Sequence, residues 1–473
     1  MESIHQRIKR DREAALGDAI KVRDYRDYAD GDQRGTISAE QKAILGAVVG
    51  NDFADNVCDL ALSTAASRLE LTGFDVEDGS EAESDFIHDL YTKNQLGDLQ
   101  YDVHYRTTRD GNHALGLRWL PDDRRRDEAN DPDAGEPASR SSGRVTIHHE
   151  PWWDGRDTGV FVAYDEAGAP AYAVKDFTQV MGDPPRPRLR RTIYFPDHLE
   201  RYLKDGDGWA AFALPDDPPD GIVPWTKADG SPLGIPIIHF PNGRFGRAPY
   251  GASDLAGGVL GLQDELNDLQ RDITAAARLT AYQMLTVTGA TISNLRVGPG
   301  RVLGSERADA RIGAIPAGDM SQILAGHAMK LATIARNTAT PIHLIAGGDW
   351  PSGAALLRAE MPLVAKVQRM GKTIGPAWAT LAHRATEIAN AFGGLRLDEA
   401  KLITAVFAPP EKLDAQTLVD IDKARVGVYA ALQMLDDPVL LRKTGLLTED
   451  EITTMVSDRT RRAAESVAVI GEF

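Results

Sequence analysis

The spacing of apolar residues predicts helices in the first part of the chain. Residues 3–28 are charged and helix-compatible, and Ser38 with Gln41 forms a capping-box pattern that predicts a second helix through Val49. A third helix is expected from about Asp52, because one face would carry Phe53, Val57, Leu60 and Thr64. An extended segment at 67–76 and a short helix at 85–94 are expected to follow.

From residue 99 the pattern changes to short runs of β type between turn residues. The turn residues at 109–112 predict a hairpin with strands at 101–107 and 113–120. Further strands are expected at 145–149, 159–164, 171–176, 190–195, 209–214 and 235–240. Residues 121–143 lack large apolar side chains and cannot bury enough surface to offset their ordering entropy, so they are expected to form a mobile insertion.

The next segment predicts two helices around a small β element. A heptad seam begins after Ser253, the expected N-cap, and consists of Leu255, Val259, Leu262, Leu266, Leu269 and Ile273. This helix is expected to run to Gln283, and a second one is expected over 319–337. Between them, the glycine-broken residues 284–316 are of β type. Since a heptad seam packs against other helices, both helices are expected to have helical partners.

A longer helix is predicted from Gly353 to about Asn390. One face would carry Leu357, Met361, Val364, Ile374, Trp378, Leu381, Ala385 and Ile388. Pro362 and Pro376 each remove a backbone donor, so the helix should bend where it passes through them. The glycine-rich residues 344–353 ahead of it read locally as a helix–helix turn. A strand at 400–408 and further helices are expected to complete the chain.

Composition indicates a folded protein of two or three domains and limits its chemistry. The 473 residues are 42% hydrophobic, with no run of eighteen apolar residues and no apolar leader, so neither a membrane span nor a secretory signal is expected. The net charge of -17 argues against tight static wrapping of nucleic acid, which requires Lys and Arg to neutralise phosphates. The single cysteine, Cys58, excludes an internal disulfide and is expected to be a buried thiol.

No catalytic constellation or metal site is identified, and no cofactor is expected. The adjacent His148 and His149 would face opposite sides of a strand. A divalent cation could bind the acidic stripe Asp264, Asp268 and Asp272, and phosphate could bind the arginines Arg186, Arg188, Arg190 and Arg191. Both groups are better explained as solvated faces.

The order of parts resembles the portal proteins of tailed bacteriophages, in particular the siphovirus-type head-to-tail connector. The resemblance rests on FPNGRFGRAPYGASDLAGGVLGLQDELNDLQRDI from Phe240, a helix, a β excursion, a returning helix that ends in TATPIHLIAG, and WPSGAALLRAEMPLVAKVQRM. Recurring family features are matched by Asp264, Glu265 and Asn267, and by Pro351, Ser352 and Gly353 with Glu360. The resemblance covers most of residues 38–392.

The resemblance implies an α+β portal fold. Its parts would be a β-rich wing (1–250, with the insertion at 121–143), a first stem helix (251–283), a small β clip (284–317), a second stem helix (318–338), a tunnel loop (339–353), a kinked wing helix (354–395) and a helical crown (396–473). Each stem helix would bury the heptad seam against its own and neighbouring subunits, a seam that a monomer would leave exposed to water.

The function implied is that of a virion protein assembled in the host cytoplasm, and not that of an enzyme. A ring of about twelve copies at one capsid vertex would form the channel for genome packaging and ejection. The partners implied are the terminase large subunit, the head–tail adaptor, the major capsid and scaffolding proteins, and weakly bound double-stranded DNA. Twelve chains of charge -17 would together carry about -204 formal charges, which would let DNA slide through the channel.

The resemblance also assigns roles to individual residues. The DNA-facing tunnel loop would contain Leu344, Ile345, Ala346, Gly347, Gly348, Asp349 and Trp350. Sparse phosphate contacts in the stem are implied for Lys330 and Arg336, with ordinary surface ion pairing an equal alternative. Docking of terminase and adaptor on the clip would involve Arg296, Arg301, Glu306 and Arg307.

Two other functions remain open from the sequence. An unrecognised phage-associated hydrolase would be a monomer or small oligomer whose titratable residues converge in a pocket. A non-portal adaptor protein of the virion would also form rings.

Overall fold

The computed structural model describes residues 3–19, 21–33, 55–122, 142–156, 158–181, 185–214, 217–243, 249–281, 285–288, 311–314, 320–346 and 353–411. The chain divides into two units, Met1–Pro410 and Glu411–Phe473. The helix expected at 38–49, nearly all of the insertion at 121–143 and the helices expected after residue 411 lie outside the described residues. The described part is mixed α+β, as the sequence predicts.

The N-terminal helices lead into a strand that pairs with the end of the first unit. They are α1 (Ile4–Ala19), α2 (Val22–Ala29) and α4 (Val57–Ala66), and β1 (Leu71–Val76) follows. β1 pairs antiparallel with β13 (Ile403–Phe407), so residues far apart in sequence form one two-stranded sheet. The next helix, α5 (Glu81–Lys93), begins with a capping box between Ser80 and Glu83. The strands expected at 67–76 and 400–408 are thus confirmed.

The hairpin predicted around 109–112 is wrong in its first half, because Leu96–Asp110 forms helix α6. Apolar and polar residues alternate along 99–107 as in a strand, but the buried side chains follow a helical spacing: Leu96, Gln100, Val103, His104, Thr107 and Thr108. Two of the polar ones, Gln100 and His104, are satisfied by backbone groups of another segment. The Gln100 side chain bonds to both the N–H and the C=O of Leu71, and His104 Nδ1 donates to the Leu69 carbonyl.

Two antiparallel sheets form the β-rich part. The first has the order β10–β2–β3, with β2 (Asn112–Pro121) between β3 (Gly143–Glu150) and β10 (Ile237–Pro241). The second has the order β4–β5–β6–β7–β8 and comprises β4 (Gly159–Tyr164), β5 (Pro170–Met181), β6 (Arg186–Tyr194), β7 (His198–Asp205) and β8 (Gly208–Ala211). A short strand, β9 (Ile222–Pro224), pairs with β7. The predicted strands are confirmed, whereas β7 and β9 were not predicted.

The arginines of β6 are not a uniformly solvated face, contrary to the expectation. Arg186 and Arg188 are exposed, but Arg190 and Arg191 are buried. Arg190 Nη1 donates to Gln179 Oε1 at 2.5 Å, and both Nε and Nη2 of Arg191 donate to Asp176. Each buried guanidinium therefore has a partner on β5.

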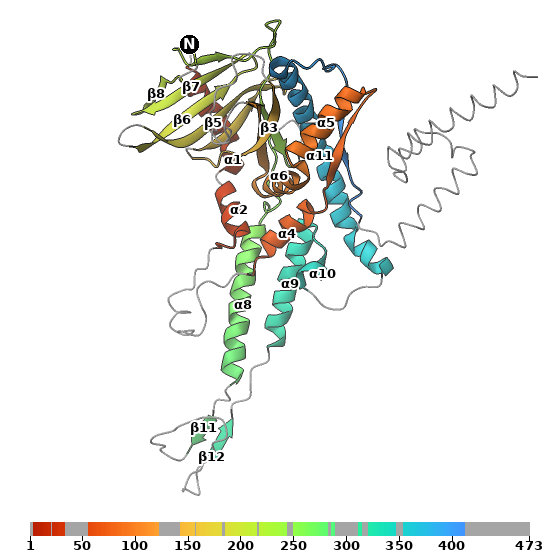
Figure 1. Cartoon of the computed structure of the whole chain (residues 1–473). Helices are drawn as coiled ribbons and strands as arrows, with labels where there is room; N and C mark the ends of the chain where they lie inside the picture. The colour runs from red at the N-terminus through yellow and green to blue at the C-terminus, as the bar shows by residue number, and fades with distance from the viewer. Residues whose placement is uncertain are drawn as a thin grey trace, which may run out of the picture. The chain divides into compact units, whose positions relative to one another are not determined.

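The predicted helix–β–helix segment is present, as Figure 1 shows. It consists of α8 (Val259–Ala281), the antiparallel pair β11 (Leu285–Thr288) and β12 (Arg311–Ala314), and α9 (Ser321–Thr338). α8 starts at Val259 and not directly after Ser253 as predicted, because Gly257 and Gly258 have φ values of 75° and 91°, outside the helical region. Ser253 accepts a hydrogen bond from the Leu255 N–H in the turns that precede the helix.

Helix α11 (Gly353–Gly393) forms the centre of the largest core. It stays helical through Pro362 and Pro376 and packs against β2, β3, β10 and β13. The predicted apolar face holds in its second half, where Ile374, Trp378, Leu381, Ala385 and Ile388 are buried. In its first half the prediction is wrong: Leu357 and Met361 are exposed, and Leu363, Val367 and Met370 are buried instead. Among the described helices, none is long and apolar enough to cross a bilayer.

Candidate functional site

The heptad seam of α8 is largely buried inside its own chain. Leu255, Val259 and Leu266 are at most 1% exposed, and Leu262, Leu269 and Ile273 are half-buried. Their cluster includes Leu331 and Ile334 of α9 together with side chains of α2 and α4, namely Tyr25, Tyr28, Ala29, Val57, Cys58 and Leu62. The expectation that a monomer would leave this seam exposed to water is therefore wrong for its first half. The N-terminal helices cover it, which the spacing along α8 alone could not reveal.

Polar side chains fix α8 against the N-terminal helices. Asn267 accepts a hydrogen bond from the Asp55 N–H at 3.1 Å and donates to Gln33 at 2.6 Å. Gln263 donates to the Asp55 carbonyl, and Tyr28 donates to Asp264 at 2.6 Å. The residues Asp264 and Asn267, singled out by the resemblance, thus hold α8 in place. The buried thiol of Cys58 lies 3.7 Å from Gln263 Oε1, and burial raises the pKa of Cys58 to about 12.

The acidic stripe of α8 has structural partners along part of its length. Asp264 accepts from Tyr28, and Asp268 pairs with Arg271 one turn later, while Asp272 is exposed. Within the described residues, no group of three or more histidine, cysteine or carboxylate side chains is arranged to hold a metal ion.

Lys366 of α11 joins the two points where α8 and α9 meet the rest of the first unit. Its side chain is 7% exposed. Its Nζ lies 2.5 Å from Asp254 Oδ2, just ahead of α8, and donates at 2.9 Å to the carbonyl of Thr338, the last residue of α9. Asp254 also accepts a hydrogen bond from Asn242 at 2.8 Å. This junction was not predicted from the sequence, although a lysine on the apolar side of a long helix is a signal for it.

The segment expected to be the tunnel loop begins with a short helix. α10 (Ile342–Ala346) contains Leu344, Ile345 and Ala346, and Ile345 packs against the cluster around the α8 seam. Gly347, Gly348, Asp349 and Trp350 lie outside the described residues. After them, Glu360 of α11 accepts from Arg68 at 3.2 Å and lies 3.9 Å from His343 of α10. Glu360, another residue of the resemblance, therefore binds α11 to the turn after α4 and lies close to α10.

The two cations expected to contact DNA differ in their surroundings. Lys330 forms an ion pair with Glu265 of α8. Arg336 is exposed near the end of α9. The ion pair of Lys330 is the ordinary structural role that the sequence left as an alternative. Arg296, Arg301, Glu306 and Arg307, expected on the clip, lie outside the described residues.

Several exposed apolar side chains belong to three consecutive helices. Of the eleven large apolar residues exposed in the described part, five belong to α9, α10 and the start of α11: Leu324, Met329, Ile342, Leu357 and Met361. α10 contacts α9. We refer to these five residues as the α9–α11 apolar surface.

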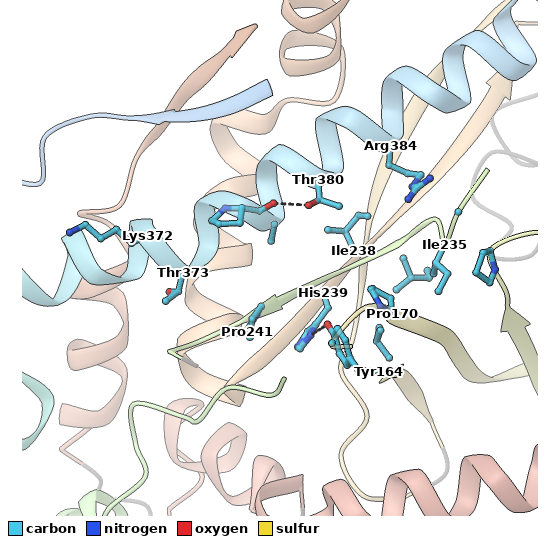
Figure 2. A pocket seen from close by; sticks show the side chains of 17 residues that line it. Tyr164, Pro170, Ile235, Ile238, His239, Pro241, Lys372, Thr373, Thr380 and Arg384 are labelled. Atoms are coloured by element: carbon cyan, nitrogen blue, oxygen red, sulfur yellow. Dashed lines mark hydrogen bonds between the residues drawn. The ribbon is translucent and has the colours of Figure 1, made fainter. Parts of the chain in front are cut away.

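A groove of about 570 Å³ lies between β10, the ends of β4 and β5, and α11 (Figure 2). His239 donates from Nε2 to Asn112 at 2.9 Å and accepts at Nδ1 from the Tyr164 hydroxyl at 2.6 Å. Thr380 donates to the Pro376 carbonyl, the hydrogen bond that Figure 2 marks, and Thr373 donates to the Met370 carbonyl. No Ser, Cys, Asp or Glu lines this groove. Its polar groups serve the fold and are not arranged as a nucleophile with its base.

Comparisons with known proteins give a structural similarity but no sequence match. No protein-family model matches the chain, and no curated protein does. A chain from the neck of the empty GTA (gene transfer agent) particle, computed with C6 symmetry, has 13% identity and a TM-score of 0.44, with 88% of this chain and 95% of that chain covered. A chain from the neck of the native particle, computed with C12 symmetry, has 13% identity and a TM-score of 0.39, with 89% and 93% covered. Both alignments cover most of this chain.

Proposed function

We propose that this chain is a neck component of a phage-like particle and, more specifically, the portal subunit. About twelve copies would form a ring at one capsid vertex, through which the genome is packaged and ejected. The terminase large subunit, the head–tail adaptor, and the major capsid and scaffolding proteins would bind this ring. Double-stranded DNA would pass through it while binding only weakly.

The observation that carries this proposal is the order and packing of α8, β11–β12, α9, α10 and α11. Two helices in contact, an antiparallel β pair between them in sequence, and a later 41-residue helix with two internal prolines support the order of parts that the portal resemblance implies. Residues of that resemblance, among them Asp264, Asn267 and Glu360, make the contacts between these helices and the N-terminal ones. These side chains therefore support the arrangement of the stem.

The α9–α11 apolar surface supports assembly into a ring. A closed ring of identical chains needs a head-to-tail contact, in which one surface of a subunit meets a different surface of the next. Since the first half of the α8 seam is already covered within the chain, the apolar surface on α9–α11 is the better candidate for this contact. Met361 and Met329, which are 64% and 63% exposed, are its most accessible side chains. Burying them against a neighbour would stabilise the ring by roughly 1.5–3 kcal/mol for each side chain.

The test is the native mass of the purified full-length chain, measured by mass photometry, with negative-stain images of the same sample. The proposal predicts particles near twelve times the 51.3 kDa chain mass, with a central hole. A stable monomer or dimer at micromolar concentration, which stays so when capsid or scaffolding protein is added, would contradict the portal function and favour the hydrolase alternative. A ring without terminase or capsid binding would instead favour a different ring-forming adaptor.

A further inference from the structure

A second cavity, of about 580 Å³, lies between helix α1 and the sheet that contains β5, β6, β7 and β8. It is separate from the groove of Figure 2 and shares no lining residue with it. Its charged and aromatic lining residues are His5, Lys9, Arg12, Glu13, Trp153, Arg156, Asp176, Arg191, Lys204, Asp207 and Trp209. We refer to this cavity as the α1 pocket.

One buried carboxylate in the α1 pocket serves two buried guanidinium groups. Arg191 binds Asp176 with two hydrogen bonds of 2.7 Å, from Nε to Oδ1 and from Nη2 to Oδ2. Arg12 donates from Nη1 to the same Oδ2, also at 2.7 Å. The three side chains are between 2% and 8% exposed. Two positive charges thus share one negative charge, which leaves one buried positive charge without a counterion.

Arg12 has unused hydrogen-bonding capacity. Its Nε and Nη2 are buried and have no hydrogen-bond partner among the described residues. Its guanidinium lies over the Trp153 ring, 4.8 Å from the ring centroid, which offsets part of the cost of burying the charge. A buried charge that lacks a full set of partners is costly, and proteins usually retain such a group where a ligand completes it.

The rim of the α1 pocket adds further positive charge. With Lys9, Arg156 and Lys204, the pocket has five basic side chains against the three acidic ones Glu13, Asp176 and Asp207, in a chain whose net charge is -17. Burial, and then the charge of Arg191, lower the pKa of His5 to about 4, so this ring is neutral near pH 7. An overall acidic chain has therefore concentrated basic groups in one concave site.

We propose that the α1 pocket binds an oxyanion, with Arg12 as its buried donor, Arg191 adding positive charge beside it, and Lys9, Arg156 and Lys204 around its mouth. The ligand chemistry is that of a phosphate or carboxylate group, because both accept several hydrogen bonds from guanidinium and ammonium groups. The bound group compensates the second positive charge that Asp176 leaves unpaired. This site does not depend on the portal function and stands or falls separately from it.

The test is isothermal titration calorimetry on the full-length chain at low ionic strength, with inorganic phosphate and with succinate in separate titrations. We expect saturable binding of at least one of them, with a dissociation constant of about 1 mM or tighter. Saturation by phosphate alone identifies a phosphate site, and saturation by succinate alone identifies a site for carboxylates such as acidic side chains. Saturation by neither anion overturns the proposal.

Substitutions test whether the anion binds in the α1 pocket. Arg12→Gln should abolish it, and Lys204→Ala should weaken it about three-fold or more, the size expected for a partly exposed charge pair. Lys204 is partly exposed on β7, so its variant keeps the test valid if Arg12→Gln does not fold. The matched control is Lys93→Ala on α5, an exposed lysine that does not line the pocket. An equal loss in the Lys93 variant would show general attraction of anions and would overturn the proposal.

Discussion

At the scale of single residues, Lys366 joins three segments that are far apart in the sequence. It holds Asp254 and the Thr338 carbonyl, so one ammonium group connects the entry to α8, the end of α9 and the middle of α11. We expect Lys366→Met to destabilise the chain by about 3 kcal/mol, because it leaves the Asp254 carboxylate without its cation in a site little exposed to water.

Urea unfolding followed by circular dichroism measures this effect. The matched control is Lys93→Ala, which removes an exposed i,i+4 pair with Asp89 and should cost less than about 0.5 kcal/mol. If both variants unfolded at the same urea concentration, the junction at Lys366 would not be the structural link described above.

His104 gives the chain a defined pH dependence. It is fully buried, accepts a hydrogen bond at Nε2 from the Trp378 indole and donates from Nδ1 to the Leu69 carbonyl. Burial lowers its pKa from 6.5 to about 4. Between these values the unfolded chain binds a proton that the folded chain does not, so stability is complete above about pH 6.5 and is lost as the pH falls towards 4.

The contribution of His104 reaches about 3 kcal/mol at the acid end of this range. His104→Phe should lower stability at neutral pH, because the Trp378 N–H and the Leu69 carbonyl lose their partner. It should also reduce the stability difference between pH 6.5 and pH 4 by about 3 kcal/mol. The exposed His88 provides the control variant, His88→Phe, whose pH profile should match the wild type. An unchanged pH slope in the His104 variant would exclude this histidine as the titrating group.

At the scale of elements, α11 contains two glycines for which one substitution has opposite expected effects. A Cβ at Gly371 would contact only the ends of the Leu69 and Phe407 side chains, at 3.4 and 3.9 Å, so Gly371→Ala should stabilise the helix by about 0.5–1 kcal/mol. A Cβ at Gly393 would overlap the buried Trp119 ring, so Gly393→Ala should destabilise the chain by about 1–3 kcal/mol. Thermal unfolding should show a higher melting temperature for the first variant and a lower one for the second. The same shift for both would contradict the described packing of α11.

Elements with local signals were predictable from the sequence, and those defined by distant partners were not. The long apolar face around Trp378 was predicted from neighbouring residues. The capping box of α5 is also a local signal, but it was not recognised, and the helix was expected to start four residues too late, at Asp85 rather than Glu81. Helix α6 was mistaken for a strand because its polar residues Gln100 and His104 were expected to face solvent. They are buried because the backbone groups of Leu71 and Leu69 satisfy them. Strand β7 was missed because Arg201, buried in its middle, is paired with Asp217 sixteen residues later.

In the candidate sites too, features with a local sequence signal were predictable, whereas features that depend on distant residues were not. The α8 seam was visible as a heptad, but its cover by Tyr25, Tyr28 and Leu62 requires the fold. The α9–α11 apolar surface and the pairing of Arg12 with Arg191 join segments far apart in the chain, so no local spacing indicates them. The polar residues Asp264, Asn267 and Glu360 were found through the family resemblance, and the structure supplies their physical reason.

At the scale of the whole molecule, one apolar surface is covered within a single chain and another is left for a neighbouring subunit to cover. The contacts of α8 with α2, α4 and α9 satisfy much of the seam within one copy. The α9–α11 apolar surface has no such cover among the described residues, which is why we assign the contact between subunits to it. The negative net charge would then repel DNA phosphates from the ring except where basic groups lie close to them.

The most direct test of this account compares the native mass of three proteins at one micromolar-range concentration. The wild type should assemble into rings near twelve times 51.3 kDa. Met361→Glu, which places a charge on the α9–α11 apolar surface, should give folded monomers, with an unchanged circular dichroism spectrum. Val180→Glu, at an equally exposed apolar residue of β5, should still form rings. Rings of normal mass from Met361→Glu, or a wild type that stays monomeric, would contradict the account.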